Sequence, residues 1–339
     1  MAVSSAALSK QATGSGALDR LVAATQSDME RVNALILKRA ESHVEMVPQL
    51  ARYLIEAGGK RLRPMLTVAA AQLFGNAGGS QINYAAAVEF MHNATLLHDD
   101  VVDESDLRRG RPAARMIWGN QASVLVGDFL LGQAFMMMVE AGDLGALGVL
   151  SRAATTIAEG EVFQLAKAKD LSTTSDEYHQ VIHAKTATLF AVAAEVGAMA
   201  GGADAAGREA MRVYGEELGL AFQLVDDVLD YRGEAGTLGK NSGDDLREGK
   251  MTLPVIFALQ DANPAERDII VAALGRDETP EGVLEKIVAI FERHGSLSRT
   301  IEQAELHVTR ARTALEGLPA SPMRGLLSDI AEFYVSRAY

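Results

Sequence analysis

The stretch between Pro112 and Pro254, which contains no proline, places the strongest constraint on the fold of this chain. It is rich in Ala, Leu, Glu and Met, which favour helices, whereas proline breaks them. Ahead of it, Met29, Val32 and Ile36 already recur at the spacing of one helical face. No segment sustains the strict polar and apolar alternation of a half-buried strand. We therefore expect an all-α fold in which long helices form a single-domain bundle.

The composition indicates how the interior of such a bundle is built. Apolar residues make up 48% of the 339 residues and aromatic residues only 5%, so the core should consist mainly of Ala, Leu, Val and Met. That length suits one large helical domain. Helical periodicity begins near Leu18, and the small, polar residues before it lack the apolar run of a secretory signal. Residues 1–17 are therefore expected to be a disordered lead-in, and residues 18–339 to form the domain.

Charge and cysteine content exclude several kinds of protein. The net charge of −13 argues against a nucleic-acid binder whose whole surface is positive. Because there is no cysteine, disulfides, thiolate metal sites and cysteine nucleophiles are excluded. The most apolar stretch, residues 189–203, contains Glu195 and ends in glycines, so no transmembrane span is expected. We expect a cytoplasmic protein that is not integral to a membrane and does not bind nucleic acid.

Two copies of the acidic motif D-D-x-x-D, Asp99–Asp103 and Asp226–Asp230, each follow an apolar, helix-periodic run. The first and last aspartates of each motif share a helix face, where like charges repel by roughly 0.2–0.5 kcal/mol. The macrodipole also disfavours anions near the C-terminal ends of helices. A solvated acidic helix end would explain one copy, but two copies, each followed by a basic loop, indicate a bound cation. Clustered carboxylates suit Mg²⁺ that shares its coordination with substrate phosphates.

Basic clusters accompany the acids. The segment 58–64, GGKRLRP, places Lys60 and Arg63 after two glycines, which let a ligand approach the backbone closely. Arg108 and Arg109 follow the first acidic motif by about one helical turn. Arginine and lysine donate to phosphate oxygens, so acids that hold a metal, with cations just beyond them, suit a diphosphate. An ordinary solvated turn, or arginines that only neutralise the acids, would give the same pattern.

Two further features lie beside the acidic motifs. The long glycine-rich loop 232–250 follows the second motif and contains Lys240 and Lys250, which favours a lid over a disordered linker. His92 lies two helical turns before the first motif, where a structural histidine is the usual alternative to a ligand. With Glu89 it forms one Glu-x-x-His pair, but a di-iron bundle needs a second such pair, and the sequence has none.

The order of these motifs resembles that of the trans-isoprenyl diphosphate synthases. GGKRLRP is followed by HNATLLHDDVVDESDLRRGRP, KTATLF at residues 185–190, FQLVDDVLD, LGK and EGK. The resemblance covers roughly residues 30–260. Within that family the chain looks most like the long-chain polyprenyl type, the octaprenyl or decaprenyl diphosphate synthases that make quinone side chains. The resemblance implies an isoprenoid-synthase bundle around a deep apolar cavity, with the two acidic motifs facing each other at its mouth, and a homodimer.

The resemblance also implies a role for each residue of this chain that stands at a position of the family's motifs. The resemblance implies that Mg²⁺ is bound directly by Asp99, Asp103 and Asp226. It implies that the metal ions or their waters are supported by Asp100, Asp227, Asp230 and Asp244. It implies that the allylic diphosphate is bound by Arg108, Lys185, Lys240 and Lys250. It implies that isopentenyl diphosphate is bound by Lys60, Arg63, His92 and Arg109. The residues that would face the developing allylic cation are Thr186 and Gln223.

The implied reaction lengthens an allylic diphosphate primer by isopentenyl diphosphate units. A cluster of about three Mg²⁺ ions, with cationic side chains, stabilises the leaving diphosphate so that an allylic cation forms. The double bond of isopentenyl diphosphate attacks this cation, and the departing diphosphate takes the proton, since no side-chain base is evident. A closed lid excludes water, which would quench the cation. The primer would be geranyl, farnesyl or geranylgeranyl diphosphate, and the product about C40–C50.

Small residues ahead of the first motif predict a long product. Ala94 and Thr95 lie one helical turn, about 5.4 Å, below Asp99, and a growing tail would pass them. Met91 lies a further turn down, and Phe135, with the methionines after it, would form the floor of the cavity. The alternative is that Phe135 and its neighbours are plain core, since methionine commonly fills gaps.

Competing interpretations predict different sequences. A terpene cyclase shares the first aspartate motif but carries an Asn/Ser/Glu metal triad as its second site, and squalene- or phytoene-type synthases space their aspartates differently. A catalytically silent subunit of a heteromeric synthase would have lost one motif, and both are whole. A metal-dependent binding module leaves Lys185, Thr186 and Gln223 unexplained.

Overall fold

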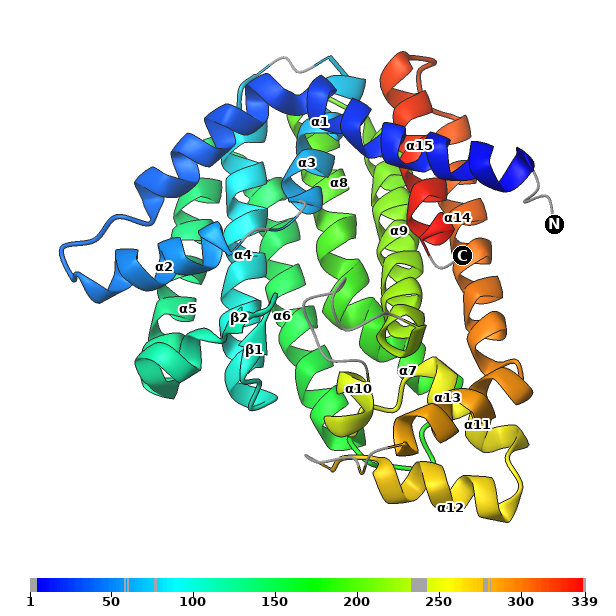
Figure 1. The fold of residues 1–339 in the computed structure, drawn as a ribbon. Helices are drawn as coiled ribbons and strands as arrows, with labels where there is room; N and C mark the ends of the chain where they lie inside the picture. The colour runs from blue at the N-terminus through cyan, green and yellow to red at the C-terminus, as the bar shows by residue number, and fades with distance from the viewer. Residues whose placement is uncertain are drawn as a thin grey trace.

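The computed structural model describes residues 5–57, 59, 61–75, 78–232, 243–276, 280 and 282–337, with side chains from Gly16 onward. This part of the chain is a bundle of long helices with one very short hairpin (Figure 1), which confirms the all-α prediction. Its elements are α1 (Ser5–Arg39), α2 (Met46–Glu56), α3 (Leu62–Leu73), α4 (Gln81–Val102), β1 (Leu107–Arg108), β2 (Arg111–Pro112), α5 (Ala114–Ala141), α6 (Leu144–Lys167), α7 (Ser175–Ile182), the π-helical turn η1 (His183–Ala187), α8 (Thr188–Ala200), α9 (Ala205–Arg232), α10 (Asp244–Arg247), α11 (Leu253–Asp261), α12 (Pro264–Ala273), α13 (Val283–Arg293), α14 (Ser296–Glu316) and α15 (Pro322–Ser336).

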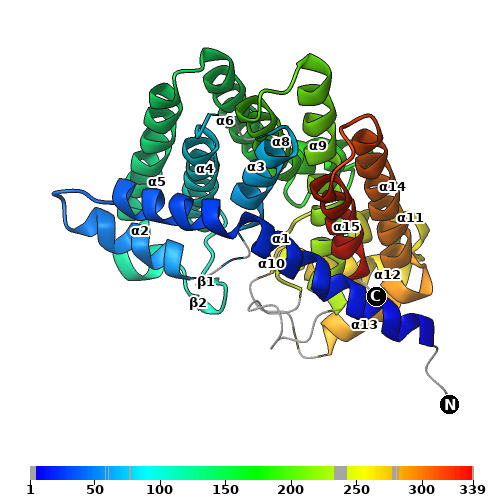
Figure 2. The ribbon, with the colours of Figure 1, turned by 90° about the horizontal axis from the view of Figure 1, so that it is seen from above.

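The long helices run side by side, and the shorter ones cover the ends of the bundle. α9 contacts α8 and α14, α8 also packs on α3, and α4 packs on α5. α1 lies across the upper end of the bundle in Figure 1 and contacts α3, α4 and α15 (Figure 1; Figure 2). The helices α10 to α13 gather at the opposite end (Figure 1). Phe90, Phe190 and Tyr214 are among the largest fully buried side chains, so the core lies between these long helices.

Small residues let the central helices approach one another closely. A Cβ atom on Gly197 of α8 would lie 2.3 Å from the backbone oxygen of Thr67 in α3. A Cβ atom on Gly215 of α9 would lie 2.4 Å from the backbone oxygen of Phe190 in α8. Such contacts explain how a chain with few aromatic residues fills its core at the usual density of protein interiors.

The helices occupy the stretch in which proline is absent. α5 to α9 follow one another from Ala114 to Arg232, and Pro254 is the second residue of α11, where its missing N–H costs no helical hydrogen bond. Antiparallel strands β1 and β2 pair Leu107 with Pro112, just after the first acidic motif. The sequence does not predict these strands, because two residues per strand give no alternating pattern.

The N-terminal helix begins before the periodic residues that predict it. α1 starts at Ser5, whereas apolar residues at helical spacing begin near Leu18, and Leu21 is buried in the core. The division of the chain into a lead-in, residues 1–17, and a domain, residues 18–339, stays a prediction.

Two helical stretches have the length and mean hydropathy of a membrane span, Ala114–Ala141 and Ser175–Ala200. In the second, 72% of the apolar window is buried by other helices, as in the core helix of a globular protein. In the first, which is α5, only 39% is buried. α5 therefore leaves an apolar face open to contact with another surface.

Candidate active site

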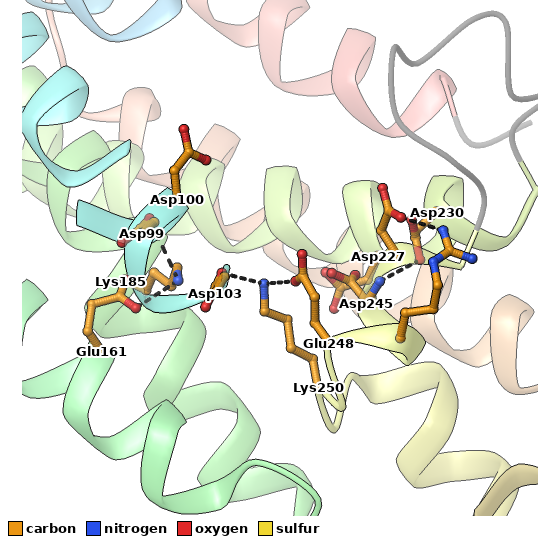
Figure 3. Close-up of polar contacts among 12 residues, drawn as sticks. Asp99, Asp100, Asp103, Glu161, Lys185, Asp227, Asp230, Asp245, Glu248 and Lys250 are labelled. Carbon is orange, nitrogen blue, oxygen red and sulfur yellow. Dashed lines mark hydrogen bonds and ion pairs between the residues drawn. The ribbon is translucent and has the colours of Figure 1, made fainter. Parts of the chain in front are cut away.

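A cavity of about 750 Å³ lies where α4 and α9 end, and it brings the predicted motifs together. Acids of the first motif lie on one side of the close-up in Figure 3, and acids of the second motif lie on the other. The predicted site residues that line this cavity are Arg63, His92, Thr95, Asp99, Asp103, Arg108, Arg109, Lys185, Thr186, Gln223, Asp226, Asp227, Asp244 and Lys250.

Lys185 lies between two carboxylates from different helices (Figure 3). Its Nζ is 2.8 Å from Glu161 Oε2 of α6 and 3.8 Å from Asp99 Oδ2 of α4. The turn η1, which carries Lys185, packs closely on α6, because a Cβ atom on Gly160 would lie 2.5 Å from the Cβ atom of Ala184. Burial raises the pKa of Asp99, and the charge of Lys185 opposes this. The lysine is thus placed to balance negative charge at the first motif.

Lys250 lies beside the last aspartate of the first motif, as Lys185 lies beside the first. Its Nζ is 3.0 Å from Asp103 Oδ2 and also forms an ion pair with Glu248 (Figure 3). Burial acts to raise the pKa of Asp103, but the charges of Lys250 and Lys185 outweigh it, so the pKa of Asp103 is lowered. Burial acts to lower the pKa of Lys250, yet Asp103 and Glu248 raise it above its usual value. Both groups are therefore charged at neutral pH.

Asp100 is turned away from the other acids of its motif (Figure 3). It is 1% exposed and accepts a hydrogen bond from Arg108 Nε at 2.8 Å. Burial acts to lower the pKa of Arg108, but Asp100 outweighs it and raises that pKa. Because Arg108 belongs to β1, this pair fixes the hairpin to the end of α4. Asp100 thus supports the first motif from the inside, and one edge of the Arg108 guanidinium is already engaged.

The second motif also divides its three aspartates. Asp226 is exposed and lines the cavity. Asp227 is 1% exposed and accepts hydrogen bonds from Tyr178 and from a glutamine of its own helix, and burial raises its pKa well above the usual value. Asp230 accepts a hydrogen bond from the backbone N–H of Asp245 at 3.3 Å, which ties α9 to α10. Asp226 is therefore the acid of this motif that is best placed to bind a metal ion directly.

Arg63 and His92 meet in the same cavity. Arg63 Nη1 lies 3.3 Å from His92 Nε2, and its guanidinium lies 4.4 Å from the ring centre of Phe190. Burial lowers the pKa of Arg63 to about 10, so the side chain stays charged at neutral pH. Burial, with the charges of Arg63 and Arg109, lowers the pKa of His92 well below its usual value. His92 is therefore neutral, and its Nε2 accepts from Arg63, because a guanidinium can only donate.

The backbone around the basic segments adopts uncommon conformations. Arg61 and Arg109 have φ values of 45° and 54°, in a region that non-glycine residues rarely occupy outside functional sites. Gly59 has φ +149°, and a Cβ atom there would lie 2.8 Å from Arg109 Nη1. The glycine makes room for the arginine, so the segment before α3 and the segment between the two strands converge at the cavity.

Two of the predicted lysines, Lys60 and Lys240, lie outside the described residues, as does the part of the predicted lid from 233 to 242. The rest of that segment is described and includes α10, where Asp244 pairs with Arg247. The assignment of a lid stays a prediction.

Among the four residues predicted to set chain length, Thr95 lines the described cavity. Ala94 and Met91 are 2% and 1% exposed, and they belong to the core cluster rather than to the lining of this cavity. Phe135 is partly buried and packs against the core. The roles of Ala94, Met91 and Phe135 in chain length stay predictions.

Several residues of the site were missed by sequence reasoning. Glu161 and Tyr178 contact predicted residues that lie 24 and 49 positions away in the chain, so no local pattern marks them. Glu248 could have been identified from the sequence, because it stands two residues before Lys250 in the motif EGK. Each of the three acts on a predicted residue as an ion-pair or hydrogen-bond partner.

The donor set fits a hard divalent cation such as Mg²⁺. Asp99, Asp103 and Asp226 supply carboxylate oxygens to one cavity. Within the described residues, no group of three or more His, Asp or Glu is arranged to hold an ion by itself. Mg²⁺ commonly keeps several waters and binds one or two carboxylates together with substrate phosphates.

The chain matches known proteins over nearly its whole length. The family described as Polyprenyl synthetase matches residues 44–291. The octaprenyl diphosphate synthase of Escherichia coli (strain K12) is 43% identical over 320 residues, which are 94% of this chain and 99% of that protein. The structure of a polyprenyl synthase from Caulobacter crescentus CB15, complexed with calcium and isoprenyl diphosphate, has a TM-score of 0.91 and 50% identity, and the match covers 95% of this chain and 98% of that chain. A decaprenyl diphosphate synthase from Rhodobacter capsulatus has a TM-score of 0.89 and 48% identity, with 95% and 99% covered.

The matched residues include both acidic motifs and the basic segments that line the cavity. The family that the motif order predicts is therefore confirmed, as is the prediction of a prenyltransferase. This chain belongs to the polyprenyl synthetase family of prenyltransferases.

Proposed function

We propose that this protein is a Mg²⁺-dependent all-trans polyprenyl diphosphate synthase. It adds isopentenyl diphosphate units to a geranyl, farnesyl or geranylgeranyl diphosphate primer and makes a chain of about C40–C50. The similarity to an octaprenyl and a decaprenyl diphosphate synthase supports that length. The observation that carries the proposal is one cavity lined by two acidic motifs and two groups of cationic side chains.

Each group of cations would bind one diphosphate. Lys185 and Lys250 lie beside the acids of the first motif and, with Arg108, would contact the allylic diphosphate. Arg63 and Arg109, next to the neutral His92, would contact isopentenyl diphosphate. Bound Mg²⁺ would supply positive charge at the leaving diphosphate. The calcium and isoprenyl diphosphate bound by the Caulobacter polyprenyl synthase support a divalent metal at such a site.

The chain's own groups would favour ionisation of the primer. The ammonium groups of Lys185 and Lys250 lower the energy of the negative charge that develops on the diphosphate as its C–O bond breaks. Thr186 and Gln223 line the same cavity, with oxygen atoms that would face the allylic cation. The double bond of isopentenyl diphosphate attacks this cation, and the departing diphosphate accepts the proton that is lost. The predicted lid, residues 232–250, would exclude water.

A product assay tests this proposal. Purified protein with Mg²⁺, isopentenyl diphosphate and farnesyl diphosphate should release inorganic diphosphate and give products of about eight to ten isoprene units. The products would be dephosphorylated and sized by mass spectrometry. A chelator should abolish the reaction, and added Mg²⁺ should restore it. Binding of both substrates without a longer chain would contradict the synthase, whereas a short product would contradict only the chain length.

The apolar face of α5 and α6 supports a homodimer as part of the proposal. The faces of stable dimers are more apolar than ordinary protein surface. Light scattering should give twice the mass of the chain, and Leu125→Glu should give a monomer. The large apolar side chains exposed on these two helices are Met116, Ile117, Val124, Leu125, Met136, Val139, Leu144, Val162 and Leu165.

The cellular role belongs to the same proposal. A cytoplasmic enzyme of this kind would supply the side chain of a quinone. Deletion of the gene should then lower the cellular content of the quinone with the matching side chain. An unchanged quinone content would contradict that role without touching the activity itself.

A further inference from the structure

A chain of hydrogen bonds runs from Tyr178 to Thr186 through two side chains of α9. The Tyr178 hydroxyl donates to Asp227 Oδ2 at 2.5 Å. Gln223 Nε2 donates to Asp227 Oδ1 at 2.8 Å, and Thr186 Oγ1 donates to Gln223 Oε1 at 2.8 Å. All four residues line the cavity, and Tyr178, Thr186 and Asp227 are buried. The chain therefore links α7, η1 and α9 within the wall of the site.

The direction of these hydrogen bonds follows from the chemistry of the groups. Asp227 Oδ1 accepts from the NH₂ group of Gln223, so this contact fixes the orientation of the amide. The amide oxygen must then face Thr186, whose hydroxyl has one hydrogen and donates it there. The reversed amide would place two acceptors against each other in a buried site, which is unfavourable.

The orientation of Thr186 has a consequence for the reaction. Its hydroxyl hydrogen is engaged by Gln223, so only the lone pairs of its oxygen are available toward the cavity. We infer that Tyr178 is a positioning residue, which fixes Asp227 and thereby orients Gln223 and Thr186 so that the threonine oxygen faces the allylic cation. The inference rests on the proposed function. It gives the second aspartate of the second motif a role in orienting other side chains, not in binding metal.

Tyr178 is needed in this arrangement because Asp227 is buried. Within the described residues, Asp227 Oδ2 accepts its hydrogen bond from the Tyr178 hydroxyl. Without it, the carboxylate can rotate, and Oδ1 no longer holds the Gln223 amide in one orientation. The effect on Thr186 is then indirect, through two side chains, so it should be smaller than the effect of removing the threonine hydroxyl.

Substitution of Tyr178 by phenylalanine tests the inference, since it removes the hydroxyl and keeps the ring. At saturating substrates and Mg²⁺, we expect Tyr178→Phe to lower kcat about tenfold, and Thr186→Val to lower it about 100-fold. The KM of the primer and the Mg²⁺ concentration for half-maximal activity should change by less than about twofold. Thr186→Ser should retain most of the activity because it keeps the hydroxyl. In the Thr186→Val background, Tyr178→Phe should have little further effect, because both act through one chain of contacts.

Tyr214→Phe is the matched control. The hydroxyl of Tyr214 is fully buried and donates to the backbone oxygen of Leu327 at 2.7 Å, away from the cavity lining. Its loss should lower the unfolding temperature and leave kcat unchanged. The comparison separates loss of a buried hydroxyl from loss of an orienting one.

Three results would overturn the inference: an unchanged kcat in folded Tyr178→Phe, full additivity with Thr186→Val, or a large rise in the Mg²⁺ requirement, which would show that Asp227 acts through the metal. If Tyr178→Phe does not fold, Gln223→Met interrupts the same chain, and additivity with Thr186→Val would again overturn the inference. A wild-type protein that lengthens no primer would refute the proposed function. An active wild type with unaffected Tyr178→Phe would refute only this inference.

Discussion

Lys250 Nζ lies 3.0 Å from Asp103 Oδ2, although 147 positions separate the two residues in the chain. The contact joins the segment that follows residues 233–242 to the end of the first acidic motif. Because both side chains are largely buried, their attraction is screened less than that of a surface ion pair. The charge at this end of the cavity therefore depends on both segments being in place.

Lys250→Ala should lower kcat by about 100-fold and raise the KM of the allylic primer, because it removes a cation that we propose to contact the leaving diphosphate. Lys286→Ala, at an exposed position on α13, is the matched control and should behave as wild type. Steady-state assays at saturating isopentenyl diphosphate would measure both variants. A normal kcat for Lys250→Ala at saturating primer would show that its ion pair serves the fold alone.

Asp99→Ala and Asp226→Ala should each reduce turnover by about 1,000-fold or more, because each removes a carboxylate that we propose to bind metal. The unfolding temperature should change little, because relief of the repulsion between the first and last acids of a motif offsets the loss of attraction to a cation such as Lys185. Asp268→Ala, exposed on α12, provides a control for loss of an acid elsewhere. Near-normal activity of Asp226→Ala at saturating Mg²⁺ would mean that the second motif does not hold metal.

The two diphosphate sites should separate kinetically. Arg63→Ala should mainly raise the KM of isopentenyl diphosphate, by about tenfold or more, while Lys240→Ala should mainly affect the allylic substrate and the chemical step. Arg63→Lys should recover little, because lysine cannot reproduce both the donor fork and the stacking on Phe190. Initial rates measured against each substrate in turn would decide. If both alanine variants affected both substrates equally, the assignment of the two sites would be wrong.

His92 should make the protein less stable in mild acid. Burial, with the nearby arginines, holds its pKa in the folded state well below the usual value of about 6.5. Below that pH the unfolded state binds a proton that the folded state does not, so the free energy of unfolding falls, by at most about 1.4 kcal/mol per pH unit. Urea titrations from about pH 7.5 to 5 should show a shallower decline for His92→Gln. Equal declines in both proteins would contradict a neutral, buried His92.

Thr95→Phe should shorten the product more than Ala94→Phe does. Thr95 lines the cavity, whereas Ala94 is 2% exposed and packed in the core. An aromatic ring one helical turn, about 5.4 Å, below the first motif would stop the tail after roughly three or four isoprene units. The sequence alone predicts this result for Ala94→Phe. Thr95→Ser is the control for length, and long products from active Thr95→Phe would show that the tail leaves along another path.

The parts of the site that could be predicted are those with local patterns. Helical spacing placed Asp99–Asp103 and Asp226–Asp230 at helix ends, and the structure has them there. The partners of these motifs could not be predicted in the same way. Glu161 meets Lys185 only because a glycine lets α6 approach η1, and such packing between distant segments leaves no spacing to detect.

The direction of individual side chains within a motif also needed the structure. Successive residues of a helix point about 100° apart, so Asp100 and Asp227 cannot face the same way as the aspartates before them. Helix geometry predicts that these side chains point elsewhere, but it does not predict which residues they contact. Asp100 is buried against Arg108, and Asp227 against Tyr178, because partners from β1 and α7 happen to be available on those faces.

The turn His183–Ala187 contains one residue more than a regular α-helical turn would need. Deleting Ala184 would let α7 continue into α8 as an ordinary helix. The wide turn absorbs its extra residue within itself, so α7 and α8 would keep their faces, and the residues of the turn itself would be re-aimed. The bundle would keep its helices and its core, yet Lys185 and Thr186, which lie within the turn, would no longer line the cavity as they do now. One added residue therefore places these side chains in the cavity. Its deletion should abolish the activity and leave a stable, folded protein.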